Sequence, residues 1–391
     1  MNLPARKRLP LPERTFAGLL VLMCACVDPY LAPAIQDDHY ILVIDGFLIP
    51  NDTTVIKLSR TNPIYSKEGY QAEVNAFVEI EANDGTRYQL IEKTAGTYVS
   101  PPLNLDPAHQ YRLHVRTGDT EEYASEFVAI KNSHQIDSVT WKEITEGDAL
   151  EFSVYSHDPQ SKTRYYLWTY DETFEYVSGG LSRYYYENGQ VIARKSSTEI
   201  NICWKTNKLN NIYVTSTNKL SDDIVYDFPL YRVPQKSRKL FFAYSVLVKQ
   251  IALTEGAYAY WSSTKRNSEH LGSLFDPIPS QPLTNFACLT NPSTPVAGYF
   301  TASTIVTKRV FLTRQEIKGP STLYEETGYE NCEGELILLA DISEENLKGK
   351  IINDRYDDVI TQEFLGYIVL TEYCLDCRKR GGINVRPDFW K

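Results

Sequence analysis

Apolar and polar residues alternate along most of the chain from residue 39 onward. In residues 111–116, apolar and basic side chains follow one another with a period of two, which is typical of a half-buried strand in an antiparallel sheet. The sequence Asn83-Asp84-Gly85 interrupts the pattern with residues that favour a hairpin turn. Short strands separated by such turns predict a β-sandwich. We therefore assign residues 39–133 to one immunoglobulin-like β-sandwich.

The alternation continues over residues 134–391, which we interpret as a larger β-rich domain. A further hairpin is predicted at Asn188-Gly189. Over residues 254–270 the apolar side chains recur at helical spacing instead, after a threonine that suits an N-cap. A shorter helix is predicted over residues 343–349. The fold class is therefore mainly β: an N-terminal immunoglobulin-like β-sandwich followed by a larger β-rich domain with one or two helices.

The first residues of the chain carry a different pattern. A basic segment precedes an apolar run over residues 16–25, and Cys26 follows directly after a small residue. This order is typical of a secretory signal, and the alanine before the cysteine fits cleavage by lipoprotein signal peptidase. We predict a signal peptide over residues 1–25, lipidation of Cys26, and a tether over residues 26–38 that begins at the lipidated cysteine.

Two alternatives to this signal remain open. The apolar run could instead be a transmembrane anchor or an uncleaved apolar region of a signal, but a span would need about 20 apolar residues, roughly twice its length. Cys24 is a second candidate for lipidation, but Met23 before it fits the small-residue rule badly. Lipidation at Cys26 would place the protein outside the inner membrane of a bacterium, held to a lipid leaflet by acyl chains.

The overall charge limits the partners that the protein can have. The chain has a formal net charge of −10, and removal of the basic leader would make it more acidic still. Binding to nucleic acid needs a basic face that displaces counterions. We therefore predict no nucleic-acid partner, and no adhesion to anionic lipid beyond the anchor itself.

Five of the seven cysteines remain after the leader and the anchor are set aside, and an odd number leaves at least one thiol free. Cys374 and Cys377 form a Cys-x-x-Cys motif, and Cys332 precedes them. Outside the cytoplasm disulfides are expected, so we interpret these three as disulfide candidates, in a framework where Cys332 joins one of the other two. A redox pair or a metal site is the alternative. Such a framework would pin the C-terminal tail, which ends in Phe389-Trp390, to the domain.

No motif in the sequence indicates catalysis. The six histidines are scattered, and His157-Asp158 has no Gly-x-Ser-x-Gly nucleophile to serve. Carboxylates are abundant, but nothing selects one pair for acid–base chemistry. We predict that the protein is not an enzyme, that it has no catalytic residues, and that it uses neither a cofactor nor a metal ion.

Two segments are candidates for binding a partner. Phe275 and Asp276 lie in a proline-rich loop that could present an aromatic ring, and Tyr184, Tyr185 and Tyr186 form a tyrosine run. Each has a structural alternative. The loop could simply cap a sheet, and the 28 tyrosines of the chain favour pleated sheet in general.

Several short motifs in fixed order resemble a single family. They are Cys26-Val-Asp-Pro, Val43-Ile-Asp-Gly-Phe-Leu, Tyr258-Ala-Tyr-Trp, Gly272-Ser-Leu-Phe-Asp-Pro-Ile-Pro, Val296-Ala-Gly-Tyr-Phe, Cys374-Leu-Asp-Cys-Arg-Lys-Arg-Gly-Gly and Arg386-Pro-Asp-Phe-Trp. Together they resemble a lipoprotein family of Bacteroidetes-type bacteria, the domain of unknown function numbered four-two-four-nine. The resemblance spans the mature chain, although Pro282-Leu-Thr-Asn departs from the Gly-Asn pair associated with that loop.

The resemblance carries expectations about location and partners. Members of the family look like outer-membrane lipoproteins, on the periplasmic face or at the cell surface, and are often encoded beside TonB-dependent receptors. It implies a non-catalytic accessory role in nutrient uptake, with the bilayer and a TonB-dependent receptor as partners. The alternative is a free-standing surface module that binds carbohydrate or peptide. The family has no established catalytic residues to carry over.

Overall fold

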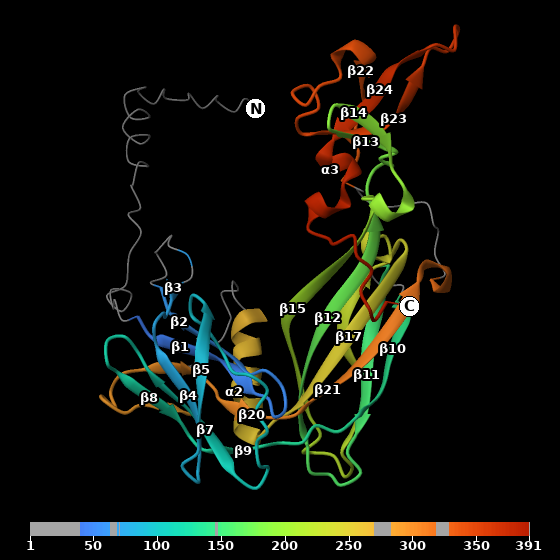
Figure 1. Cartoon of the computed structure of the whole chain (residues 1–391). Helices are drawn as coiled ribbons and strands as arrows, with labels where there is room; N and C mark the ends of the chain where they lie inside the picture. Colours follow the sequence, from blue (N-terminus) through green and yellow to red (C-terminus); the bar gives the residue numbers. More distant parts are fainter. Residues whose placement is uncertain are drawn as a thin grey trace, which may run out of the picture.

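The computed structural model describes residues 40–62, 69, 71–144, 148–269, 283–317 and 328–390. Figure 1 shows three parts: an N-terminal β-sandwich, a second β-sandwich, and a small lobe beyond the far end of the second sandwich, which we call the distal lobe. The prediction of a mainly β fold is confirmed. Cys26, its leader and tether, and the loop with Phe275 and Asp276 lie outside the described residues.

The N-terminal sandwich is one continuous sheet that encloses a core, with hydrogen-bonded order β8-β7-β4-β5-β6-β2-β1. Alternate residues of these strands point inward and are fully buried, as the period of two predicts. The Asn83-Asp84-Gly85 turn joins β4 to β5 as expected. The strands are β1 (Leu42–Leu48), β2 (Val55–Arg60), β3 (Gln71–Ala72), β4 (Phe77–Ala82), β5 (Arg87–Thr94), β6 (Thr97–Val99), β7 (Gln110–Arg116), β8 (Glu122–Ser125) and β9 (Val128–Ala129).

A second segment of the chain completes this sandwich. β18 (Phe286–Cys288) pairs with β8, while β19 (Val296–Gly298) and β20 (Thr301–Ala302) pair in parallel with β1. Gly298 permits the close approach, because a Cβ there would lie 2.1 Å from the carbonyl oxygen of Ile44. The predicted division at residue 133 does not include this segment, since no local pattern reports a parallel pairing across about 250 residues.

The second sandwich consists of a three-stranded sheet, β10-β11-β16, and a four-stranded sheet, β15-β12-β17-β21. Its core is aromatic: Tyr166 stacks on Trp168, and Phe152 stacks on Tyr231. Its strands are β10 (Ile136–Ile144), β11 (Ala149–His157), β12 (Tyr165–Val177), β15 (Ile202–Ser216), β16 (Ile224–Pro234), β17 (Ala243–Ala252) and β21 (Ile305–Thr313).

Helix α2 (Glu255–Glu269) joins the two sandwiches and confirms the helix predicted over residues 254–270. Thr254 caps it, because its Oγ1 accepts a hydrogen bond of 3.2 Å from the amide of Ala257. Trp261 stacks on Phe47 of the N-terminal sandwich at 5.6 Å between ring centroids. Ala257 packs in the same cluster with Leu167 of the second sandwich. The helix therefore fills the junction with apolar contacts from both sides.

The distal lobe combines a hairpin inserted between β12 and β15 with the C-terminal part of the chain. The predicted turn at Asn188-Gly189 closes the hairpin, with both residues at positive φ. The strands and the short helix of the lobe are β13 (Tyr184–Glu187), β14 (Gln190–Ala193), β22 (Glu335–Leu338), β23 (Lys350–Asp357), β24 (Phe364–Thr371) and α3 (Glu372–Leu375). Single 3₁₀ turns are η3 (Ser196–Thr198), η4 (Arg238–Leu240), η5 (Arg314–Glu316), η6 (Leu339–Asp341) and η7 (Cys377–Arg380).

Residues 343–349 form hydrogen-bonded turns and not the predicted helix. The amide of Leu347 does reach the carbonyl of Ser343, at 3.1 Å, but the ladder stops there. Gly349 lies at φ 74°, outside the helical region. A segment this short cannot offset the cost of helix nucleation by itself.

Two disulfides fix the distal lobe. Cys203 on β15 pairs with Cys377, and Cys332 pairs with Cys374. Cys288 is the free cysteine among the described residues, and it is buried. Within the same residues, none of the helices is long and apolar enough to span a bilayer.

Candidate binding pocket

A cavity of about 400 Å³ lies where the distal lobe meets the second sandwich. This volume falls within the range of small-molecule pockets. The lining combines the end of β12, the turn after it, the segment around η4 and one residue of the C-terminal part: Tyr176, Val177, Ser178, Gly179, Arg238, Phe241, Phe242 and Tyr329. We call this cavity the aromatic pocket.

Close packing holds one wall of the aromatic pocket. Tyr329 packs against Gly179, where a Cβ would come within 2.8 Å of the tyrosine ring. Arg380 covers Tyr329 at 3.8 Å from the ring centroid and donates a hydrogen bond to the carbonyl of Gly328. The hydroxyl of Tyr176 donates to the carbonyl of Cys377 at 2.6 Å. This wall therefore depends on the lobe staying docked.

The opposite wall comes from η4. Leu240 is buried in the core of the second sandwich, so the turn has a fixed anchor. Arg238 and Phe241, on either side of this anchor, line the cavity together with Phe242. The two phenylalanine rings meet edge to face at 4.5 Å between centroids. Aromatic side chains thus face the cavity from both walls.

The charge near the pocket is opposite to that of the whole chain. Burial raises the pKa values of Tyr176 and Tyr329, against the opposing effect of Arg238 and Arg380. Both tyrosines are therefore neutral at physiological pH. The eight lining residues include an arginine but no carboxylate, imidazole or thiol. The site can hold a planar or apolar body beside an anionic group, and its side chains offer no evident general base.

A wider groove of about 800 Å³ runs between α2 and the second sandwich. Tyr165 and Tyr258 meet there at 5.2 Å between centroids, among serine, asparagine and charged side chains. The Oγ of Ser262 is buried without a hydrogen-bond partner among the described residues. The groove has more hydroxyl, amide and charged side chains in its lining than the aromatic pocket has, and it suits a hydroxyl-rich ligand.

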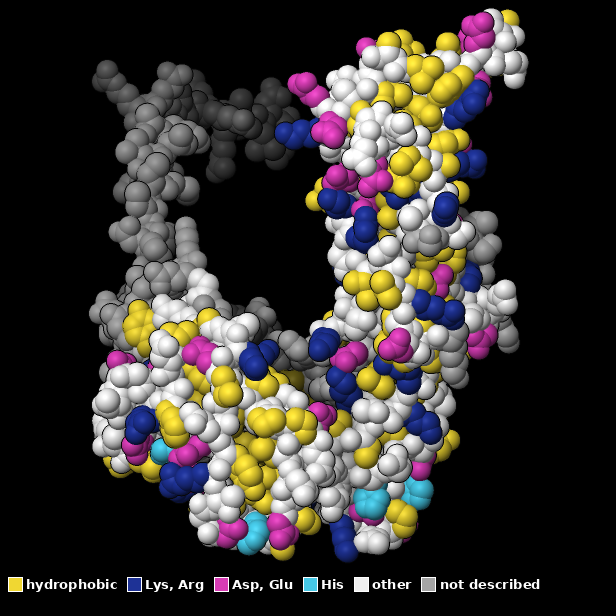
Figure 2. Space-filling view, in the orientation of Figure 1, with side chains coloured by type: hydrophobic (Ala, Val, Ile, Leu, Met, Phe, Trp, Pro, Cys, Tyr) yellow, Lys and Arg dark blue, Asp and Glu magenta, His cyan; other side chains and the backbone are white. Residues whose placement is uncertain are grey.

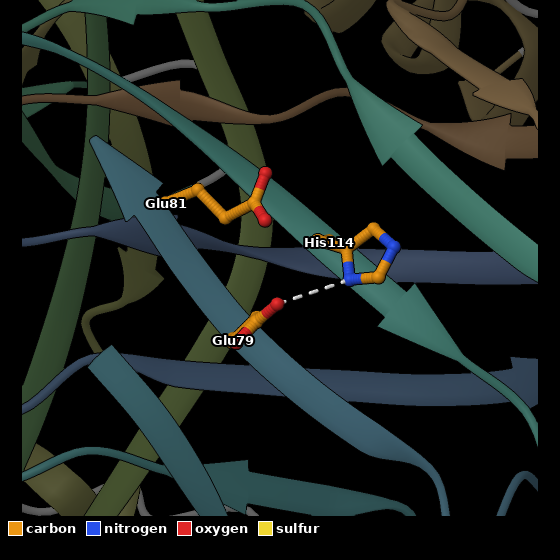
Figure 3. A group of neighbouring side chains, drawn as sticks. All are labelled: Glu79, Glu81 and His114. Carbon is orange, nitrogen blue, oxygen red and sulfur yellow. Dashed lines mark ion pairs between the residues drawn. The ribbon is translucent and has the colours of Figure 1, made fainter. Parts of the chain in front are cut away.

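A third arrangement lies on the outer face of the N-terminal sandwich, where Glu79 and Glu81 of β4 face His114 of β7 (Figure 3). Their potential ligand atoms all lie within 4.8 Å of one another. Arg87 already occupies the position between the carboxylates, at 2.8 Å from each, and Arg112 lies 2.6 Å from Glu81. Although burial opposes it, the hydrogen bond from Arg112 lowers the pKa of Glu81. The two carboxylates of the cluster are thus paired with arginine side chains in an ion-pair network.

The tyrosine run, which stays a candidate for binding a partner, lies half-buried in the distal lobe. Tyr184 meets Tyr367 edge to face at 5.3 Å, Tyr185 lies under Arg194, and Tyr186 belongs to the core of the lobe. None of these three lines the aromatic pocket. The predicted disulfide framework is confirmed for Cys332, Cys374 and Cys377, which all form bonds.

Sequence reasoning missed both Cys203 as the partner of Cys377 and the aromatic pocket. Cys203 stands alone in a strand, so no motif marks it. The pocket joins residues near 177, 240 and 329, which come together only through the tertiary fold. The one local signal was Phe241-Phe242 after a basic turn, a pair of aromatic residues at a strand entry.

Two β-sandwiches joined by a helix and extended by a disulfide-bonded lobe define a modular, mainly β protein. The chain belongs to the family described as Domain of unknown function (DUF4249), whose model matches residues 27–309. This match confirms the resemblance drawn from the short motifs. The matched range covers both sandwiches up to β21 and ends before most of the distal lobe.

Many solved structures resemble the chain, among them the following two. A two-domain fibronectin type-III segment of chicken tenascin is 10% identical, covers 55% of this chain and 92% of its own, and has a TM-score of 0.17. The MSCRAMM ACE of Enterococcus faecalis, described as binding its ligands by the collagen Hug model, is 9% identical, covers 56% and 91%, and has a TM-score of 0.12. TM-scores this low do not support a shared fold, so the fold is assigned from the strand pairing of this chain itself. No curated protein matches the chain.

Proposed function

We propose that this protein is a lipoprotein, held to the outer membrane by acyl chains on Cys26, that acts by binding and not by catalysis. In this proposal it is an accessory to a TonB-dependent transporter in nutrient uptake. The leader pattern, the family and the acidic charge of the chain support the proposal. Three acyl chains would make the anchor effectively permanent.

The aromatic pocket is the observation that carries the binding role. Its volume suits a small molecule, its walls are aromatic, and Arg238 lines it in a chain of net charge −10. We assign it a ligand with a planar or apolar body and one anionic group. Arginine recognises carboxylate and phosphate groups through paired hydrogen bonds, while aromatic rings favour flat faces.

Co-purification tests the accessory role. The lipidated protein is extracted from outer membranes with detergent, captured by an affinity tag, and its partners are identified by mass spectrometry. We expect a stoichiometric outer-membrane barrel, and we expect Cys26→Ala to move the protein out of the membrane fraction. Recovery of the protein only as a free monomer would contradict the proposal.

The groove along α2 favours the second candidate function, a free-standing module that binds carbohydrate or peptide. Its paired tyrosines and polar side chains suit a hydroxyl-rich ligand better than an anion. Glycan and peptide arrays probed with the wild type and with Tyr258→Ala separate the two candidates. Binding that is lost in Tyr258→Ala, together with an empty co-purification, would favour the module.

A further inference from the structure

The sheet of the distal lobe has order β22-β24-β23, and its two edges differ. The β23 edge is covered by the chain that leads into β13: the amide of Arg183 donates to the carbonyl of Asn353 at 2.9 Å, and the hydroxyl of Ser182 donates to that of Ile352 at 3.0 Å. β23 is also distorted by two register shifts against β24. Both are ways in which proteins protect a sheet edge.

The β22 edge has none of these protections among the described residues. β22 pairs with β24 in regular antiparallel register, and none of the other strands in the described part of the chain pairs with it. Gly366 allows the two strands to lie close, since a Cβ there would come within 2.1 Å of the carbonyl of Ile337. Every second residue of an edge strand points its N–H and C=O groups away from the sheet. β22 therefore presents backbone groups ready to pair.

The side chains of β22 extend this surface. Ile337 is buried in the lobe core, but Leu336 is 39% exposed and Leu338 is 47% exposed. Leu339, directly after the strand, is 48% exposed. Figure 2 shows hydrophobic side chains gathered over the distal lobe. An exposed apolar edge strand is unusual in a soluble protein unless something pairs with it.

The chain segment that contains this edge is acidic. Residues 330–345, which contain β22, carry six Asp or Glu and no Lys or Arg. Lys350 on β23 forms an ion pair with Glu335 at 2.6 Å. The edge thus combines an apolar strip with flanking negative charge, which is complementary to an apolar segment with basic ends.

We propose that β22 binds an extended segment of a partner protein by strand addition. The segment would be apolar at alternate positions, so that its side chains meet Leu336 and Leu338, and basic at its ends. Main-chain hydrogen bonds would supply affinity, and the leucines and acids would supply selectivity. The proposal rests on the accessory role proposed above, because it names the surface through which a partner would be held.

A synthetic peptide tests this edge directly. The probe is fluorescein-labelled Lys-Lys-Thr-Val-Thr-Val-Thr-Val-Lys-Lys, and binding to the full mature protein is followed by fluorescence anisotropy. Two matched peptides serve as controls: one with glutamate in place of every lysine, and one with N-methylated valines. We expect each control to bind at least about tenfold more weakly, because the first reverses the charge and the second removes backbone donors.

Leu336→Glu should weaken binding of the lysine peptide by at least about tenfold, since it adds a charge to the apolar strip. Val359→Glu is the matched control. Val359 is 79% exposed in the turn between β23 and β24, away from the edge, so this variant should bind as the wild type does. Intact disulfides, checked by mass spectrometry, show that the lobe still folds in each variant.

Three results would overturn the proposal: equal binding of the N-methylated peptide, unchanged binding by Leu336→Glu, or a wild-type dimer that Leu336→Glu dissociates while no peptide binds. The last would assign the edge to a second copy of this chain. If the wild-type protein co-purifies with no transporter, the accessory role is contradicted. If Leu336→Glu retains the transporter as well as the wild type does, the docking edge is contradicted but the accessory role is not.

Discussion

The N-terminal sandwich and the distal lobe are stabilised in different ways. Among the residues that the structure describes, twenty buried side chains form the core of the sandwich, and no disulfide lies within it. Three buried residues form the core of the lobe, and both disulfides lie there or tie it to β15. A small core cannot offset the conformational entropy of folding, so small units depend on cross-links. The comparison shows where this chain relies on covalent bonds.

The two regions also differ in what they leave exposed. In the distal lobe Ile360 is 91% exposed, Val359 is 79% exposed and Tyr373 is 63% exposed. Among the described residues of the N-terminal sandwich, the most exposed large hydrophobic side chain is Ile91, at 61%, and part of the outer face carries the ion pairs of Glu79 and Glu81. We therefore propose that the N-terminal sandwich serves as a support and that binding takes place at the lobe and at its junction with the second sandwich.

Removal of the long-range disulfide should have the largest effect. Cys203→Ser combined with Cys377→Ser opens a bond between residues 174 apart, which the loop-entropy relation values at about 5 kcal/mol. The lobe should become sensitive to protease and the aromatic pocket should lose its Tyr329 wall. Urea unfolding followed by limited proteolysis measures this. Cys288→Ser is the matched control and should leave the lobe resistant, whereas an equally resistant double variant would contradict the comparison.

A truncation in the core of the N-terminal sandwich should destabilise that region and not the lobe. Leu58 is fully buried in the N-terminal sandwich, so Leu58→Ala should lower the free energy of unfolding by about 3 kcal/mol. Protease resistance of the lobe should not change. Ile91→Ala, at a position 61% exposed on β5, should cost far less. Loss of the lobe in Leu58→Ala would show that the two regions unfold as one unit.

The parallel pairing of β1 with β19 can be tested at Gly298. Gly298→Ala places a Cβ against the carbonyl of Ile44 at φ 128°, and should cost about 2 kcal/mol of unfolding free energy. Gly85→Ala is matched in having positive φ, but it meets nothing within 4 Å. A larger loss for Gly298→Ala, measured by urea unfolding, supports the two-segment sandwich. Equal losses of unfolding free energy in the two variants would mean that backbone strain at positive φ, and not the contact with Ile44, accounts for the cost.

The smallest predicted effect is on pH dependence in the lobe. Although burial opposes it, hydrogen bonds from Arg378 lower the pKa of Asp376 below the ordinary 3.8. Because the folded pKa is depressed, the stabilisation is present above the ordinary pKa and is lost as the pH falls through the folded value. Between pH 5 and pH 2 the lobe should lose stability, and Asp376→Asn should lose less over the same range. Identical urea midpoints at each pH for both proteins would show that Asp376 does not cause the pH dependence.

Much of the local structure follows from local pattern. Asn188-Gly189 predicts its hairpin, and Thr254 predicts the start of α2, since turn and cap chemistry act over a few residues. The Cys-x-x-Cys motif marks two cysteines that form disulfides, but each pairs with a cysteine elsewhere in the chain, so the motif does not give the pairing. The prediction over residues 343–349 was wrong because so short a segment does not offset the cost of helix nucleation.

Long-range pairing could not be predicted in this way. The return of residues 286–302 to the N-terminal sandwich and the bond from Cys203 to Cys377 depend on contacts between distant segments. The aromatic pocket has the same origin, because Tyr176, Arg238 and Tyr329 lie on three separate segments. Alternation reports which face of a strand is buried, but not which strand lies beside it.

Site-specific photo-crosslinking in living cells tests the division of roles between the two regions most directly. A photoreactive phenylalanine analogue replaces Tyr373 or Ile360 in the distal lobe, or Ile91 in the N-terminal sandwich, all exposed positions. The account predicts cross-links to an outer-membrane protein from the lobe positions and none from position 91. Cross-links from position 91 alone, or from no position, would contradict it.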